Sequence, residues 1–80
     1  MRPEELRDVI REQPFRPFRI FVSDGSAYDV RHPELIFVTR RRVLIALPTE
    51  NGDDMTDDFV RCDPVHITRI EPIRDASPQS

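Results

Sequence analysis

The sequence predicts a mainly β fold, in which an N-terminal helix precedes a small, strongly bent antiparallel sheet or a five-stranded barrel. Three observations lead to this fold class. Phe18, Ile20 and Val22 alternate with Arg19, Phe21 and Ser23, which is the period of a half-buried strand. Asp24-Gly25 then gives a hairpin signal, and two further apolar runs flank three consecutive arginines at Arg40–Arg42.

The helix is expected near the N-terminus and ends before Pro14. Pro3 suits the first helical position, and two glutamates follow it at the positive end of the helix dipole. Leu6, Val9 and Ile10 recur at helical spacing and form one apolar stripe. A helix of about ten residues is too short to be stable alone, so this stripe must pack on the rest of the domain.

The first hairpin is expected to close through the three-residue loop 23–25, with Gly25 in a left-handed conformation. A two-residue turn would place Ile20 opposite Asp29 and mix apolar with charged residues on one face. The longer loop shifts the register by one and gives three compatible pairs: Ile20 with Tyr28, Phe18 with Val30 and Arg19 with Asp29.

The second hairpin, "LIFV" followed by "VLIAL", is apolar on both faces. One face pairs Val38 with Val43 and Ile36 with Ile45. A sheet with one solvated side would alternate instead, so we expect both faces to be covered, the second by the N-terminal helix or by a partner subunit. The residues of this second face form the predicted oligomer interface: Leu35, Phe37, Leu44 and Ala46.

The arginine tip, Arg40–Arg42, closes this hairpin. It contains no glycine or asparagine, so a four-residue loop from Thr39 to Arg42 is less strained than a two-residue turn. Three environments are open for the tip: solvent, the acidic loop 50–58, or a phosphate group. Five arginines are candidates for contact with nucleic acid or an acidic partner: Arg40, Arg41, Arg42, Arg16 and Arg19.

The phenylalanines near these arginines offer a second means of binding bases, because aromatic rings can stack on single-stranded nucleic acid. A small domain without tryptophan needs its phenylalanines in the core, however, and we expect most of them there. Phe15 and Phe21 are the expected exposed exceptions.

The remaining sequence completes one domain over residues 1–72. "FVRC" and "HITRI" are short strands, and Asp63-Pro64 between them marks a single helical turn. Residues 73–80 contain Pro78 and mostly small or polar residues, which predicts a disordered tail.

The residues do not form a catalytic, cofactor or metal motif, and we expect a protein that is not an enzyme. Cys62, His32 and His66 lack the close pairing of a structural zinc site. Cys62 precedes Asp63, whose charge raises a thiol pKa and disfavours a nucleophile. The acidic loop does not match a calcium loop, because Gly52 in the sixth position would make Leu47 the first ligand. We therefore expect no cofactor.

Net charge, hydropathy and cysteine content indicate which classes of partner and which cellular compartment to expect. The net charge is −3, which disfavours a general electrostatic attraction to nucleic acid. All 12 basic residues are arginine, whose side chain suits phosphate or carboxylate groups. No apolar run reaches the length of a membrane helix, and no signal peptide is recognisable. A single cysteine cannot form a disulfide within the chain, which favours a reducing, cytoplasmic location. We expect no membrane contact.

Two stretches resemble known groups. "VSDGSAYDV" and "VHITRIEP" resemble the first hairpin and closing strand of the bacterial Sm-like RNA chaperone, which implies a small Sm-like or SH3-like barrel. That chaperone's uridine-binding motif has no counterpart, since Cys62-Asp63-Pro64 occupies its place. "QPFRPFRIFVSDGSAYDVRHPELIFV" is similar to short uncharacterised bacterial proteins with a Pro-Phe-x-Pro-Phe, Asp-Gly and His-Pro-Glu pattern.

The leading hypothesis for function is a non-enzymatic interaction module that self-associates as a homo-oligomer or binds another protein. It rests on the doubly apolar hairpin and on strand edges that can pair with a second chain. The alternative is binding of RNA or single-stranded DNA through the arginine tip.

Overall fold

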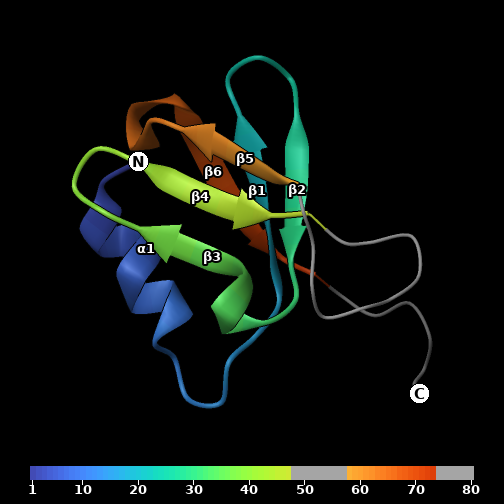
Figure 1. The fold of residues 1–80 in the computed structure, drawn as a ribbon. Coiled ribbons are helices and arrows are strands. Elements are labelled where there is room, and N and C mark those ends of the chain that lie inside the picture. Colours follow the sequence, from blue (N-terminus) through green and yellow to red (C-terminus); the bar gives the residue numbers. More distant parts are fainter. Residues whose placement is uncertain (48–57, 74–80) are drawn as a thin grey trace.

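The computed structural model describes residues 1–47 and 58–73, which form one helix and two small antiparallel sheets (Figure 1). The mainly β class and the N-terminal helix are confirmed. In chain order the elements are α1 (Pro3–Ile10), β1 (Phe18–Val22), β2 (Ala27–Val30), the 3-10 turn η1 (Pro33–Leu35), β3 (Ile36–Val38), β4 (Val43–Ala46), β5 (Phe59–Cys62), the 3-10 turn η2 (Pro64–His66) and β6 (Ile67–Pro72).

Helix α1 packs on the domain through the predicted stripe. Leu6 is completely buried, and Val9 and Ile10 pack against the core at its edge. At the start of the helix, the Glu5 carboxylate accepts a hydrogen bond of 3.1 Å from the backbone N–H of Arg2. This bond satisfies one of the N–H groups that lack a partner within the first turn.

The first sheet has the strand order β2–β1–β6, and the predicted hairpin register is confirmed. Phe18 pairs with Val30, Arg19 with Asp29, and Ile20 with Tyr28. The loop is the expected three-residue bulge: the N–H of Gly25 bonds to the carbonyl of Val22, and Gly25 has a φ of 94°. The Asp24 carboxylate accepts the N–H of Ser26 at 2.9 Å and stabilises the turn.

The second sheet has the strand order β3–β4–β5 and the register expected for its hairpin. Val38 pairs with Val43 and Ile36 with Ile45. The arginine tip closes as a four-residue loop, in which the hydroxyl of Thr39 accepts the N–H of Arg42 at 3.0 Å. No non-glycine residue among the described ranges has a positive φ, so the tip turns without backbone strain.

The five-stranded barrel is not confirmed. Six strands form two separate three-stranded sheets, and no pairing within residues 1–47 and 58–73 joins the sheets into a barrel. Two predicted strand ends are also wrong. Leu35 closes η1 and does not begin β3, and His66 ends η2 and does not begin β6.

The predicted tail begins at Ile73, whose N–H bonds to the carbonyl of Pro17 at 3.1 Å. Residues 74–80, and residues 48–57 of the acidic loop, lie outside the described residues.

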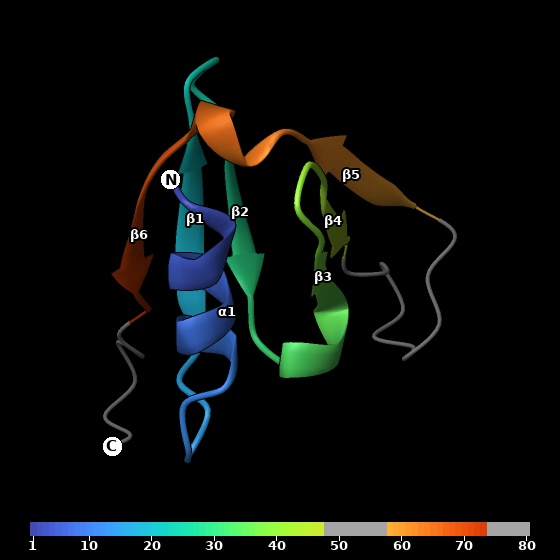
Figure 2. The same cartoon turned by 90° about the vertical axis from the view of Figure 1, so that its left-hand side faces the viewer.

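The two sheets lie face to face as layers, and α1 runs along one side, in front of β1 (Figure 2). The core is formed by the inward side chains of both sheets together with the helix. Its buried members are Leu6, Phe18, Ile20, Val30, Ile36, Val38, Val43, Ile45 and Ile67. Each sheet therefore has one face in the core and one face directed outward.

Gly25 gives a direct test of the left-handed turn that closes the first hairpin. A Cβ at this position would meet nothing within 4 Å, so a substitution there acts through the backbone conformation alone. We expect Gly25→Ala to lower the free energy of unfolding by about 1–2 kcal/mol, as measured by urea denaturation, because alanine disfavours positive φ. Gly25→Asn is the matched control and should lose clearly less, since asparagine tolerates this region. Equal losses for the two variants would argue against the backbone explanation.

Candidate functional site

The second face of the β3–β4–β5 sheet is the strongest candidate site. Its side chains form what we call the apolar outer face: Leu35, Phe37, Leu44, Ala46 and Phe59. Phe37 is 64% exposed and Phe59 is 59% exposed, whereas the other three are half-buried. The described residues thus leave two aromatic rings largely uncovered on one small sheet.

Strand register fixes the arrangement of this face. Phe37, Leu44 and Arg61 lie side by side across the three strands, and Ala46 and Phe59 form the next row. Leu35 and Glu34 border the second row on the β3 side. Together with Phe37, Leu44 and the second row they line a shallow depression of about 190 Å³. The two phenylalanines therefore lie on one diagonal of the face, and Glu34 and Arg61 lie at the ends of the other diagonal.

The predicted oligomer-interface residues are brought together here, and of the two covers expected for them, the helix is wrong and a partner subunit stays a prediction. Helix α1 does not cover this face, because Leu6 directs the helix into the core between the sheets. Sequence reasoning missed Phe59. Its signal was the alternation of "FVRC", in which Val60 and Cys62 pack on the core and Phe59 and Arg61 point outward.

The outer face of the β2–β1–β6 sheet has the opposite character and is a charged outer face. Arg19 binds Asp29 through two hydrogen bonds of 2.6 and 3.2 Å, and Arg31 approaches the same carboxylate at 3.7 Å. Arg69 binds Glu71 at 2.8 Å, and its guanidinium lies 3.9 Å from the ring centre of Phe21. The charges on this face satisfy one another.

The expectation that Phe15 and Phe21 would be the exposed phenylalanines is wrong. Phe21 is half-buried beneath the Arg69 guanidinium. Phe15 is half-buried against Phe18, with ring centres 5.9 Å apart. The exposed rings are instead Phe37 and Phe59.

The candidate arginines are divided among separate environments. Arg19 is engaged by Asp29, while Arg16 lies with Glu12 beyond the end of α1. The arginine tip is exposed and forms no ion pair with a described residue. Acidic side chains lie nearby, because Arg40 lines one hollow with Glu4 and another with Asp63.

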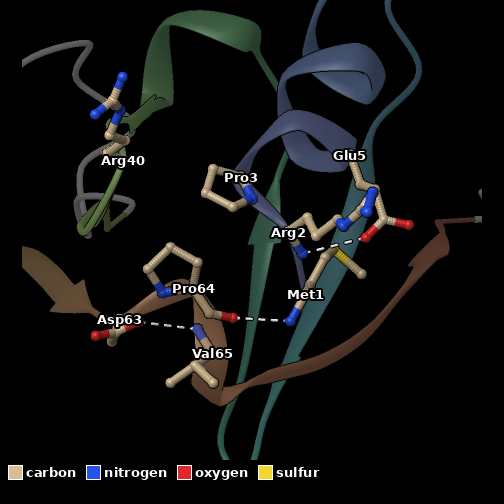
Figure 3. A pocket seen from close by; sticks show the side chains of 8 residues that line it. All are labelled: Met1, Arg2, Pro3, Glu5, Arg40, Asp63, Pro64 and Val65. Carbon is tan, nitrogen blue, oxygen red and sulfur yellow. Dashed lines mark hydrogen bonds between the residues drawn. The ribbon is translucent and has the colours of Figure 1, made fainter.

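The hollow next to the tip, of about 550 Å³, lies between the N-terminal segment and η2 (Figure 3). Two of its polar groups are paired within the chain: the amine of Met1 donates to the carbonyl of Pro64 at 3.0 Å, and the Asp63 carboxylate accepts the N–H of Val65. Arg40 points away from Asp63 and Pro64 (Figure 3). The contacts of the Met1 amine hold the N-terminal segment against η2.

The nucleophilic and metal-binding side chains do not assemble into a centre within the described residues. Burial, followed by the charges of Asp63 and Asp24, raises the pKa of the Cys62 thiol. The Ser23 hydroxyl lies 3.4 Å from Nδ1 of His66, but the neighbouring Asp24 carboxylate is bound to the backbone of Ser26. No group of three or more histidine, cysteine or acidic side chains in residues 1–47 and 58–73 could hold a metal ion.

Comparison with protein families, curated proteins and solved structures finds no match to this chain. The resemblances to the Sm-like chaperone and to the short bacterial proteins stay predictions. In the part of the chain that the structure describes, no helix is long and apolar enough to cross a membrane.

The Arg19–Asp29 pair predicts a specific titration behaviour. The hydrogen bonds from Arg19, and then its charge, lower the pKa of Asp29, so the pair stabilises the fold above the ordinary aspartate pKa. This stabilisation is lost as the pH falls through the lowered value. We expect Arg19→Gln to raise the pKa of Asp29, as followed by NMR titration of the carboxyl carbon.

Arg69→Gln is the matched control, because Arg69 binds Glu71 and does not contact Asp29. The Asp29 titration should be unchanged in this variant. An equal shift of Asp29 in both variants would indicate a general charge effect in place of the specific pair.

Proposed function

We propose that this protein is a non-enzymatic interaction module that self-associates through the apolar outer face. The exposure of Phe37 and Phe59 on the same sheet is the observation that supports this most directly. Aromatic side chains in the middle of a patch are the residues that most often dominate binding energy in protein interfaces. Two exposed rings with aliphatic neighbours resemble the centre of such an interface.

The contrast between the two sheets strengthens the proposal. Both outer faces belong to strands of similar length, yet one is covered by ion pairs and the other by apolar side chains. Solubility alone would favour charged residues on both faces, since a contiguous apolar patch costs free energy in water. Retention of apolar residues on one face is explained if that face is buried in a complex.

Phe37→Glu tests the proposal. Wild-type protein should form dimers or higher oligomers at micromolar concentrations in sedimentation velocity, and the variant should associate at least about tenfold more weakly. The side chain is mostly exposed, so the fold should be retained, which circular dichroism checks.

Val65→Glu is the matched control, because Val65 is 71% exposed but lies in η2, outside the apolar outer face. It introduces the same charge and should leave association unchanged. A wild-type protein that stays monomeric at all concentrations, or equal weakening by both variants, would overturn the proposal.

Binding of RNA or single-stranded DNA by the arginine tip is the second candidate. Three consecutive exposed arginines without an ion pair to a described residue favour it, whereas the net charge of −3 and the nearby Glu4 and Asp63 oppose it.

Affinity for a single-stranded oligonucleotide, measured at low and at moderate salt, tests this candidate. Binding through the tip should weaken with salt and should be lost when Arg40, Arg41 and Arg42 are all replaced by alanine. Arg69→Gln is the control, since Arg69 is held by Glu71 and Phe21. Absence of salt-sensitive binding at low salt, or no loss in the triple variant, would remove this candidate.

A further inference from the structure

The partner that the apolar outer face fits best is a second copy of the same face. Among residues 1–47 and 58–73, this face carries one acidic and one basic residue, Glu34 and Arg61, and these lie at opposite corners. Neither forms an ion pair with any residue in the described ranges. A surface with this distribution of charge can satisfy its own charges when two copies face each other.

We infer that two copies pack face to face about a two-fold axis that runs along the Phe37–Phe59 diagonal. This inference rests on the proposed function and specifies its geometry. Rotation about that axis leaves each phenylalanine opposite its own copy and exchanges the other two corners. Arg61 of each copy then faces Glu34 of the other copy, so the dimer contains two equivalent charge contacts around an aromatic and aliphatic centre.

One alternative axis is less favourable on charge. An axis parallel to the strands keeps the arginine tip of one copy at the same end as the tip of the other, and brings the positive ends of both copies together. The diagonal axis crosses the strands of the two sheets at about a right angle, which is one of the two common geometries of sheet packing. It also moves the two tips apart.

Charge reversal tests this geometry. Arg61→Glu and Glu34→Arg should each weaken self-association by about tenfold, since every contact occurs twice in a symmetric dimer. The variant with both changes should associate as the wild type does. A mixture of the two single variants should also form a heterodimer of wild-type affinity, because each of its two contacts then joins opposite charges.

A matched control separates this pair from the effect of net charge. Arg61→Glu combined with Glu12→Arg has the wild-type net charge, but Glu12 is exposed beyond the end of α1, away from this face. This combination should stay as weak as Arg61→Glu alone. Sedimentation velocity and circular dichroism on all variants give the affinity and verify the fold.

The outcomes distinguish the two proposals. Monomeric wild-type protein, or association that Phe37→Glu does not affect, would overturn the proposed function and this geometry together. The geometry alone would be overturned if association depends on Phe37 but the association lost in Arg61→Glu is restored equally by Glu34→Arg and by Glu12→Arg. Restoration by neither change would also overturn the geometry alone.

Discussion

The packing of the two sheets on each other, with Leu6 of α1 between them, is the constraint on which the rest of the structure depends. Within residues 1–47 and 58–73, nine buried apolar side chains make this core, and eight of them come from strands. Because side chains alternate along a strand, burial of Ile36, Val38, Val43 and Ile45 necessarily directs their neighbours outward. The outer faces are therefore a consequence of the core, and they differ in composition.

The two outer faces present different side chains to solvent. On the β2–β1–β6 sheet, cross-strand pairs such as Arg19 with Asp29 place opposite charges next to each other, and the face is complete within one chain. On the β3–β4–β5 sheet, the same cross-strand positions hold Phe37, Leu44 and Arg61, and Arg61 forms no ion pair with a carboxylate of the described residues. A second copy would supply both the apolar cover and the missing carboxylate.

Pairing logic predicted the hairpins well, because a shift of one residue would have exchanged the core and solvent faces of a strand. The register at Ile20 followed from this rule, whereas the register at Val38 followed from pairing across the arginine tip. The face of β5 was not predicted, since β5 follows a long polar loop that leaves its register open. The environments of Phe15 and Phe21 were predicted wrongly because Phe18 and Arg69 cover them, and contacts of Arg69 depend on the β1–β6 pairing across the domain.

The most direct test of the account follows methyl resonances of isotopically labelled protein over a dilution series by NMR. Leu44 and Ala46 lie on the apolar outer face, and Ala27 is exposed on the charged outer face. The account predicts that the Leu44 and Ala46 methyl signals shift with protein concentration, whereas the Ala27 signal does not. Signals that are all independent of concentration, or a shift at Ala27 without shifts at Leu44 and Ala46, would contradict it.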